Sequence, residues 1–534
     1  MLGAQLLTQA LKKAGVTTVF SLSGNQIMPV YDACIDAGIR IIHTRHEGAA
    51  VYMADAWAQL TGEIGVALIA GGPGFANGMS ALFSAKHAES PVLLLSGDSP
   101  LKQDGLGAFQ ELDQLTMTRP LVKQGLRPST VMEIAEFTAQ LIQLAHSGRA
   151  GPVHLALPFD LLETQSGHTE LPALPSFERD LTRPDVSELV TLLQQAKRPV
   201  IVTGPQCNGS RAAATLATLR HATGLPVIPM ESPRGFKDPS LGQVKQVIQE
   251  ADVVVLVGKK IDFTLDFGRS SSFATDVALA VVDPEEAVLT LAKQQFADRL
   301  RYTQQAHAQD TLTALSTSLT HQAHQQAWAE LVAQRLVERP EQSDTATNGE
   351  MLSPREVCAD IQALLDRDPN AILISDGGEF GQWIQAFCQA PKRVINGVSG
   401  AIGGGLSYAI AAKIAYPNST VIAAMGDGTV GFHLSEFDTA TRENAAFIAV
   451  IGNDHRWNAE HLIQLRNYGP ERLIGCELNP DAKYEGAAQA LGGLGFNVTT
   501  KQELSKALAS AVNHTQPACI NVHIKGAPAP EYLT

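Results

Sequence analysis

Two short acidic motifs in the last third of the chain combine residue types that can bind a divalent cation and a diphosphate. Gly426-Asp427-Gly428 directly follows the apolar run 421–425, and Asn453-Asp454 follows a second apolar run, 446–451. Residues 434–444 between them predict a helix, so the two runs are the parallel strands of one strand–helix–strand unit. The carboxyl ends of such strands meet at the edge where open α/β sheets bind ligands.

This pattern predicts a magnesium and diphosphate site, because Mg²⁺ takes carboxylate and phosphate oxygens as ligands. The glycines of the first motif let the backbone turn sharply and approach a ligand closely. Either motif alone is weak evidence, since Gly-Asp-Gly and Asn-Asp are also frequent in turns. Both motifs at the two strand ends of one unit favour the metal site over two unrelated turns.

A single acidic residue near the other end of the chain is the second candidate for chemistry. Glu47 lies between a predicted strand, 40–44, and a predicted helix, 49–59, which ends at Gly62. After the next buried run, 66–70, the sequence Gly71-Gly72-Pro73-Gly74 predicts a tight turn. Taken alone, Glu47 is explained as an acid that stabilises the first turn of a helix.

Composition indicates a large α/β protein. The chain has 534 residues, with 45% hydrophobic and 18% charged residues and 45 glycines, which predicts about three domains with substantial cores. The net charge of −14 argues against a nucleic-acid partner. The least charged stretch, 394–412, is interrupted by glycines and predicts no membrane span. The 6 cysteines form no CxxC pair, which favours a reducing compartment, the cytoplasm.

Three segments of alternating strands and helices follow one another along the chain. We predict an α/β fold of three doubly wound parallel-sheet domains, at residues 1–165, 185–325 and 350–534. Polar, proline-containing stretches at about 164–184 and 340–354 separate them.

With these elements in place, the two acidic motifs and the Glu47 segment resemble the thiamine diphosphate (ThDP) enzymes of the acetolactate synthase and pyruvate decarboxylase superfamily. The resemblance covers essentially the whole chain. It implies a pyrimidine-binding domain, a central domain and a diphosphate- and metal-binding domain, in that order. It also implies a homodimer or homotetramer, because the active site in this superfamily lies between two subunits.

The resemblance assigns roles to individual residues. Glu47 matches the glutamate that activates the cofactor, and Gln110, in Phe109-Gln110-Glu111, matches an active-site glutamine whose amide hydrogen-bonds substrate. Asp427 and Asp454 match the two metal ligands, and the backbone carbonyl of Arg456 matches the third. Asp454 departs from the family, which usually has asparagine there.

The remaining cofactor-binding candidates also follow from the resemblance. Asp376-Gly377-Gly378-Glu379-Phe380 matches the loop that reaches the diphosphate, and Ile402 matches the apolar residue that holds the cofactor bent. An ordinary core isoleucine is the alternative for Ile402. The full set of predicted cofactor-binding residues is Gly24, Gly74, Asn77, Asp376, Gly377, Gly378, Glu379, Phe380, Gly400, Ile402, Gly426, Asp427, Gly428, Thr429 and Asp454.

Two departures from the acetolactate synthase pattern indicate the branch of the superfamily that the chain resembles. Acetolactate synthases carry a tryptophan where this chain has Ile463, and a substrate-binding arginine in the central domain where it has Thr264. The chain is more similar to the acetolactate-synthase-like 2-hydroxyacyl-CoA lyases, which implies a lyase or carboligase acting on a small carbonyl or acyl-CoA substrate. Acetolactate synthase and 2-ketoacid decarboxylase are the alternatives, and a catalytically silent ThDP-fold binding protein is the alternative outside enzymes.

The sequence does not determine the ligand of the central domain, and the alternatives are FAD, ADP and no nucleotide. Lys259, Lys260 and Arg269 are candidates for contacts with adenine nucleotide or CoA phosphates, and solvated surface charges are the equal alternative. His87, His433 and Trp457 have no assigned role.

Overall fold

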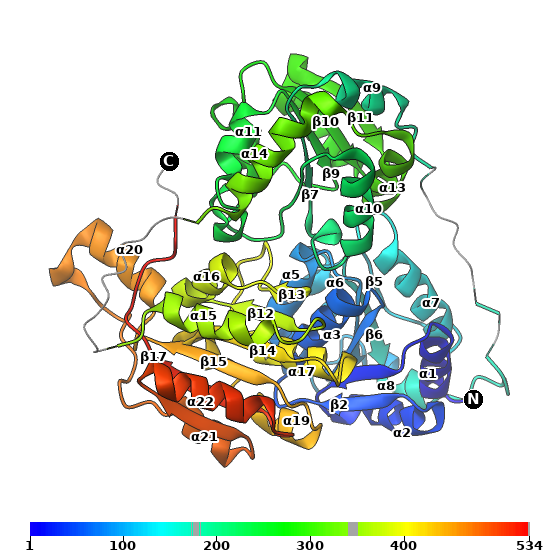
Figure 1. The fold of residues 1–534 in the computed structure, drawn as a ribbon. Coiled ribbons are helices and arrows are strands. Elements are labelled where there is room, and N and C mark those ends of the chain that lie inside the picture. Colours follow the sequence, from blue (N-terminus) through cyan, green and yellow to red (C-terminus); the bar gives the residue numbers. More distant parts are fainter. Residues whose placement is uncertain (172, 175–180, 182, 340–350, 532–534) are drawn as a thin grey trace.

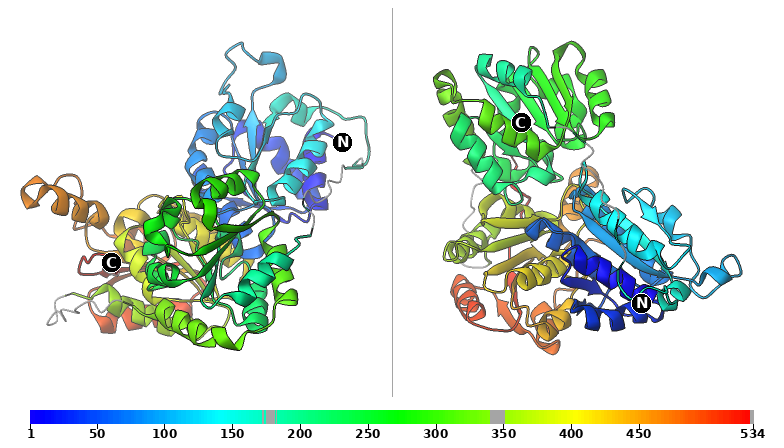
Figure 2. Two further views of the ribbon diagram at one scale, coloured as in Figure 1. Left: turned by 90° about the horizontal axis from the view of Figure 1, so that it is seen from above. Right: turned by 90° about the vertical axis from the view of Figure 1, so that its right-hand side faces the viewer.

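The computed structural model consists of three α/β units, each built on one all-parallel sheet (Figure 1). It describes residues 1–171, 173–174, 181, 183–339 and 351–531. The central unit, green in Figure 1, lies above the other two, and the views in Figure 2 show the first and third units side by side beneath it. The predicted fold class is confirmed.

The first unit has the strand order β2-β1-β3-β4-β6-β5. Its strands β3, β4 and β6 are buried along their whole length, as expected for a parallel sheet with helices on both faces. The strands are β1 (Thr18–Ser21), β2 (Arg40–His43), β3 (Gly65–Ile69), β4 (Val92–Asp98), β5 (Gly125–Leu126) and β6 (Val153–Pro158). The helices are α1 (Gly3–Lys13), α2 (Met28–Ala37), α3 (Glu47–Thr61), α4 (Pro73–Asn77), α5 (Met79–His87), α6 (Gln114–Thr118), α7 (Glu133–His146) and α8 (Phe159–Glu163).

The third unit repeats the strand order of the first, as β13-β12-β14-β15-β17-β16. Its strands are β12 (Ile372–Asp376), β13 (Lys392–Ile395), β14 (Val421–Gly426), β15 (Ile448–Asn453), β16 (Leu494–Val498) and β17 (Ala518–His523). Its helices are α15 (Pro354–Leu365), α16 (Gly378–Phe387), α17 (Gly405–Ala415), α18 (Asp427–Val430), α19 (Glu436–Arg442), α20 (Asn458–Tyr468), α21 (Tyr484–Ala490) and α22 (Lys501–Val512). The direction of winding reverses between β12 and β14, so a ligand crevice is expected at the ends of these strands.

The central unit has the order β11-β10-β9-β7-β8. Its strands are β7 (Pro199–Thr203), β8 (Val227–Pro229), β9 (Val253–Val257), β10 (Ala278–Asp283) and β11 (Leu300–Gln305). Its helices are α9 (Ser187–Gln195), α10 (Ala213–Thr223), α11 (Val244–Glu250), α12 (Glu286–Phe296), α13 (Ala308–Ser318) and α14 (Gln326–Val337). Helix α14 packs Trp328 and Val332 into the core of this unit, so the unit extends past the predicted boundary at 325.

Helices α3 and α17 join the first and third units through one shared apolar core. Their side chains also bond across the contact, where the Tyr408 hydroxyl donates to Asp55 (3.1 Å) and the Tyr416 hydroxyl donates to the Leu60 carbonyl (2.8 Å). A Cβ on Gly404 would lie 2.9 Å from the Tyr52 ring, so the start of α17 needs its glycine for this close approach.

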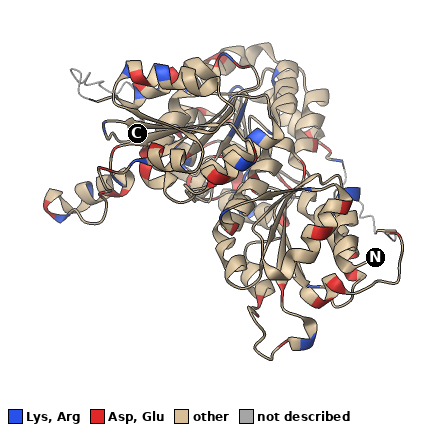
Figure 3. Cartoon of the chain, turned by 90° about the horizontal axis from the view of Figure 1, so that it is seen from below, with Lys and Arg blue, Asp and Glu red and all other residues tan. Residues whose placement is uncertain are grey.

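The surface and the cysteines complete the description. Basic and acidic residues are interspersed along the ribbon in the view of Figure 3. All six cysteines are free thiols and all are buried. Among the described residues, no helix combines the length and apolar character needed to cross a bilayer.

Candidate active site

A pair of carboxyl groups, of which Asp427 is buried and Asp454 is half-buried, lies where β14 and β15 end. Asp427 is 3% exposed, and its Oδ2 has no hydrogen-bond partner within the described part of the chain. Burial raises its pKa to about 6, partly offset by the N–H groups of Gly428, His455 and Arg456. Burial, and after it the charge of Asp427, raises the pKa of Asp454 to about 7. The structure therefore brings Asp427, Asp454 and Arg456 together, and their role as metal ligands stays a prediction.

The turn that carries Asp454 has an unusual backbone. His455 has a φ of 60°, in the left-handed region that non-glycine residues rarely adopt. This turn directs the N–H groups of His455 and Arg456 at Asp427. Trp457 follows, and its ring lies so close to Gly428 that a Cβ there would be 2.7 Å away. Trp457 therefore explains why the second glycine of the Gly-Asp-Gly motif has to be glycine.

These residues fit a magnesium ion. A buried carboxylate pair with an unpartnered oxygen is stabilised by a cation between the two groups. Across the described residues, no group of three or more His, Cys, Asp or Glu side chains could hold a metal. A cation at this place would therefore take two carboxylates and complete its shell with backbone and phosphate oxygens, which is the coordination Mg²⁺ accepts.

The predicted diphosphate loop lies beside this pair, at the end of β12. Gly377 and Gly378 have φ of 59° and 64°. A Cβ on Gly377 would lie 1.9 Å from Oγ1 of Thr429, which places two predicted cofactor residues in contact. The loops after β12 and β14 therefore meet at the switch point of the sheet.

Asp376 connects this region to the loop that carries Gly400 and Ile402. Its Oδ2 accepts hydrogen bonds from the backbone N–H groups of Gly403 (3.0 Å) and Gly405 (2.7 Å). Its Oδ1 is buried and has no partner in the described structure, and burial raises the pKa of this carboxyl to about 7. Ile402 is half-buried next to Gly403, so part of its side chain faces solvent, as a residue under a cofactor must.

Two members of the predicted loop make contacts with the protein itself. The Glu379 carboxylate accepts a hydrogen bond from the N–H of Ala529, in the C-terminal segment. Phe380 is buried and packs so closely on Gly452 that a Cβ there would lie 2.4 Å from its ring. These positions suit residues that shape the loop, while their contact with a cofactor stays a prediction.

Glu47 begins α3 in the first unit and has its own group of neighbours. The Asn77 amide donates to Oε2 of Glu47 (3.0 Å), and a Cβ on Gly74 would lie 2.9 Å from Oε1. His46, rather than Glu47, is the N-cap residue of α3, and its Nδ1 accepts from the N–H of Gly48 (3.0 Å). Because His46 caps the helix, the Glu47 carboxyl does not serve as the cap.

Gln110 lies next to the same turn. Its φ is 61°, and its Cβ lies 2.8 Å from the position that a Cβ on Gly72 would take. Gly74 and Asn77 therefore contact Glu47, and Gln110 lies against Gly72 of the same turn. Gly24 lies nearby along the sheet edge, where a Cβ would be 2.5 Å from that of Ala70.

A histidine pair that the sequence did not indicate joins the two groups of site residues within one chain. The rings of His46 and His433 are 5.3 Å apart, edge to face, and His433 Nδ1 lies 2.7 Å from the Gly403 carbonyl oxygen. The Arg45 N–H also donates to Glu436 (3.0 Å). The pairing joins residues at opposite ends of the chain, and a single histidine has no local pattern that would identify it.

Arg149 lies at the carboxyl edge of the central sheet, where the sequence predicts a nucleotide or no ligand. This guanidinium donates to Glu285 (2.9 Å), to the Gly258 carbonyl (3.1 Å), to Asp283 and to Glu89. A Cβ on Gly204 would lie 2.3 Å from the Gly258 oxygen, so the loops after β7 and β9 touch. Three carboxylates surround this guanidinium, and the choice between FAD, ADP and no nucleotide in the central domain stays a prediction.

The basic residues considered for phosphate binding are largely engaged. Lys259 is 2% exposed and donates from Nζ to Oγ1 of Thr264. Arg269 forms an ion pair with Asp266 (2.9 Å) and lies over the Phe267 ring. His87, the remaining residue without an assigned role, packs on Phe83, with ring centroids 4.1 Å apart.

Comparison with known protein families gives one match for each unit. Residues 1–117 match the thiamine pyrophosphate enzyme N-terminal TPP binding domain, residues 186–315 its central domain, and residues 376–522 its C-terminal TPP binding domain.

Curated relatives match along nearly the full length. An acetolactate synthase large subunit of Mycobacterium tuberculosis is 32% identical, with 98% of this chain and 95% of the relative covered. A 2-hydroxyacyl-CoA lyase 2 of Danio rerio is 29% identical, covering 97% and 89%. A 2-hydroxyacyl-CoA lyase of Arabidopsis thaliana is 28% identical, covering 98% and 95%. The chain therefore belongs to the thiamine diphosphate-dependent enzymes with N-terminal, central and C-terminal domains, the family of acetolactate synthase and 2-hydroxyacyl-CoA lyase.

Proposed function

We propose that this protein is a ThDP- and Mg²⁺-dependent enzyme that makes or breaks a carbon–carbon bond next to a carbonyl group, as a 2-hydroxyacyl-CoA lyase or a carboligase. The observation that carries the proposal is the pair of Asp427 and Asp454: Oδ2 of Asp427 has no partner among the described residues, and the charge of Arg456 offsets only part of the rise in the pKa of Asp454. Glu47 and its neighbours Gly74 and Asn77, on the first domain, would supply the second half of such a site.

The chain's own residues divide the work between binding and proton transfer. Asp427, Asp454 and the Arg456 carbonyl would hold Mg²⁺, and the glycine loops at 377–378 and 426–428 would admit the diphosphate. Glu47, oriented by the Asn77 amide, would hold or release a proton at the cofactor's pyrimidine nitrogen. When bound, ThDP supplies the carbon nucleophile that stores an electron pair next to the substrate carbonyl. Gln110 would donate a hydrogen bond to the substrate oxygen.

Position 264 supports the lyase or carboligase assignment over acetolactate synthase. Thr264 is 1% exposed and is bonded to Lys259 and Asp262. A buried threonine at this place gives the carboxylate of a second 2-ketoacid no bidentate partner, and lysine does not reproduce the planar fork of arginine. Ile463 is 45% exposed on α20 and offers an apolar surface without an indole N–H.

The names of the relatives support a second enzymatic assignment as the alternative. One relative is named an acetolactate synthase and others 2-hydroxyacyl-CoA lyases, at similar identities. Acetolactate formation or 2-ketoacid decarboxylation is therefore the alternative activity. A silent binding protein is disfavoured by Glu47, which a protein that only binds the cofactor has no need to retain.

We also propose a homo-oligomer, at least a dimer. The loop that follows β4 projects from the first unit in Figure 2 and carries Leu106 and Phe109, which are 77% and 78% exposed. Large apolar side chains grouped on a projecting loop indicate a protein contact surface. Gln110 lies in the same loop, so a partner subunit that covers the loop would also cover the site.

A titration tests the cofactor assignment first. We expect ThDP to bind in Mg²⁺ and to bind at least about tenfold more weakly in EDTA, because the two carboxylates repel a diphosphate without a cation. Equal affinity in both conditions contradicts the metal site.

A substrate panel with pyruvate, a 2-hydroxyacyl-CoA, oxalyl-CoA and an aromatic 2-hydroxyketone then distinguishes a lyase or carboligase from an acetolactate synthase. Acetolactate formation from pyruvate at a rate well above the other reactions would favour the alternative.

A further inference from the structure

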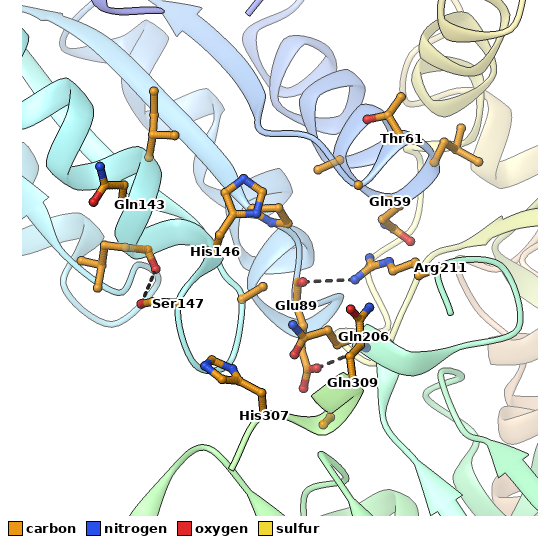
Figure 4. A pocket seen from close by; sticks show the side chains of 18 of the residues that line it. Gln59, Thr61, Glu89, Gln143, His146, Ser147, Gln206, Arg211, His307 and Gln309 are labelled. Atoms are coloured by element: carbon orange, nitrogen blue, oxygen red, sulfur yellow. Dashed lines mark hydrogen bonds between the residues drawn. The ribbon is translucent and has the colours of Figure 1, made fainter. Parts of the chain in front are cut away.

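The loop between β4 and α6, residues 99–113, carries Gln110 and projects from the first unit (Figure 2). It lies apart from the cavity of about 670 Å³ between the first and central units, because no residue of 99–113 lines that cavity (Figure 4). Leu106 and Phe109 are 77% and 78% exposed, so the apolar side chains at its tip do not anchor it to the rest of the described chain. The position of Gln110 must therefore be set largely by polar contacts within the loop and at its base.

Gln110 has a strained backbone conformation. The N–H of Glu111 donates to the carbonyl of Ala108 (3.0 Å), so residues 108–111 form a tight turn with Gln110 in its third position. The φ of Gln110 is 61°, in the left-handed region, where such turns usually have glycine or asparagine. A glutamine in this conformation persists only where the surrounding structure holds it, and residues of this kind gather at functional sites. The turn therefore needs contacts that offset the strain.

The carboxylate of Glu111 supplies these contacts from inside the loop. It accepts hydrogen bonds from the backbone N–H groups of Gly105 (2.5 Å), Gly107 (3.0 Å) and Ala108 (3.0 Å). These bonds, that from Gly105 first, lower the pKa of the Glu111 carboxyl, so the group is ionised at neutral pH. Hydrogen bonds to an ionised acceptor are stronger than those to a neutral one. One side chain thus fixes three peptide groups just before Gln110.

Arg127, directly after β5, holds the base of the same loop. Its Nη1 and Nη2 donate to the two carboxylate oxygens of Asp104 (2.8 Å each). Its Nε donates to Asp98 (2.5 Å), the last residue of β4. A bidentate pair between arginine and a carboxylate fixes direction as well as distance. The loop is therefore tied to the sheet by Arg127 and closed on itself by Glu111.

We propose that Glu111 and Arg127 are positioning residues that fix Gln110 for the substrate. Glu111 holds the strained turn, and Arg127 holds the loop on the sheet. The inference rests on the proposed function, in which Gln110 donates a hydrogen bond to the substrate oxygen. A displacement of about 1 Å can lower a rate about 10²-fold, so a loop held in place before the substrate binds favours turnover more than substrate affinity.

Hydrogen exchange tests the holding of the turn without reference to turnover. Glu111→Gln keeps the size of the side chain but removes its charge and replaces one acceptor oxygen by a donor. Exchange of the peptide 104–111, measured by mass spectrometry without ThDP, should become at least about fivefold faster in this variant. Unchanged exchange would overturn the proposal.

Glu133→Gln is the matched control for this measurement. The Glu133 carboxylate also accepts backbone N–H bonds in the first unit, from Ser129 (2.6 Å) and Thr130 (3.2 Å), but it lies outside the loop. Exchange of the peptide 104–111 should change less than about twofold in this control. An equal acceleration in both variants would contradict the role of Glu111.

Kinetics test whether Glu111 acts through Gln110. With the best substrate of the panel, we expect Glu111→Gln to lower kcat at least about tenfold, while KM and the affinity for ThDP change less than about threefold. In the Gln110→Ala background the same substitution should lower kcat less than about twofold further, because no amide remains to be positioned. A further fall of about tenfold in that background contradicts the positioning role.

The outcomes separate this inference from the proposed function. A near-native kcat in Gln110→Ala contradicts the role of Gln110 itself, and with it the purpose of the positioning. A slow Gln110→Ala together with a near-native Glu111→Gln contradicts only the inference. If Glu111→Gln does not fold, Asp104→Asn decides in its place, because it weakens the ion pair with Arg127 and should accelerate the same exchange. Unchanged exchange in that variant would equally overturn the proposal.

Discussion

At the scale of single residues, the site is a set of carboxyl groups, of which Asp376 and Asp427 are buried and Asp454 is half-buried. Asp376, Asp427 and Asp454 each have a raised pKa because the protein buries them near few compensating charges. A protein keeps such groups only where function requires them, since burying a carboxylate without a counter-charge is costly. Glu47 differs, because it is half-buried and has an amide partner.

Glu47→Gln should separate chemistry from binding. The amide has the same size and still accepts a hydrogen bond from Asn77, but it cannot hold or release the proton. We expect turnover with the best substrate to fall by at least about 10², while ThDP affinity and the thermal unfolding midpoint change little. Steady-state kinetics and a ThDP titration measure this. A variant with a near-native rate would remove Glu47 from the mechanism.

Asp376 should make the cofactor-free protein sensitive to pH. Its pKa is about 7 in the folded chain and 3.8 in the unfolded chain, so the folded state holds the proton more tightly between these values. The free energy of unfolding should therefore fall as the pH rises from about 4 to about 7 and then level off. Thermal unfolding in EDTA at pH 6 and pH 8 measures the difference. In Asp376→Asn the difference should be smaller, and an equal difference contradicts this origin.

At the scale of elements, the site depends on loops that follow parallel strands and contact one another closely. The loops after β12 and β14 meet at Gly377 and Thr429, and the loops after β14 and β15 meet at Gly428 and Trp457. Each contact requires a glycine because a side chain would overlap the neighbouring loop. The glycines therefore determine how closely the strand ends approach each other.

Gly377 and Gly378 form a matched pair for testing whether a loop contact requires glycine. Both have left-handed backbones, but a Cβ on Gly377 would overlap Thr429 Oγ1 at 1.9 Å, whereas a Cβ on Gly378 meets nothing within 4 Å. Gly378→Ala should cost only the backbone strain, about 1–2 kcal/mol. Gly377→Ala should cost more and weaken ThDP binding more strongly. Unfolding midpoints and ThDP titrations compare them, and equal effects would mean that Thr429 moves aside.

The sequence predicted the elements better than the contacts between units. Glycine turns after apolar runs placed Asp427, Asp454 and Glu47 at strand ends or helix starts, because these features are local. The predicted helix at 434–444 is the shorter α19, Glu436–Arg442, because its first residues form turns around His433. The His46–His433 contact and the contacts of Arg149 with Asp283 and Glu285 depend on how the three units pack, which no local pattern encodes.

At the scale of the whole molecule, apolar groups remain exposed on two projecting parts. The loop after β4 carries Leu106 and Phe109, and the arm that contains α20, at the left of Figure 1, carries Tyr468 and Ile474, which are 63% and 79% exposed. Exposed apolar surface of this kind is stabilised when a second chain covers it. The molecule is therefore expected to act as an assembly.

Phe109→Asp should shift that assembly toward smaller species. A charge in an apolar contact is unfavourable, whereas it is tolerated on a free surface. Ile35→Asp, at a residue that is also 78% exposed but lies on α2 of the first unit, is the matched control. Sedimentation velocity over a range of concentrations measures both. An unchanged distribution for Phe109→Asp, or an equal shift for Ile35→Asp, would remove the loop from the contact.

The burial of every cysteine has a practical consequence for spectroscopy. Burial also raises the pKa of several of these thiols, among them Cys34 to about 11 and Cys207 to about 12, so few of them ionise near neutral pH. The native chain should thus react slowly with maleimide dyes. A cysteine introduced at Ile474, on the exposed arm, would then be the dominant labelled position. A fluorophore there would report the movement of the arm during turnover without first replacing any native cysteine.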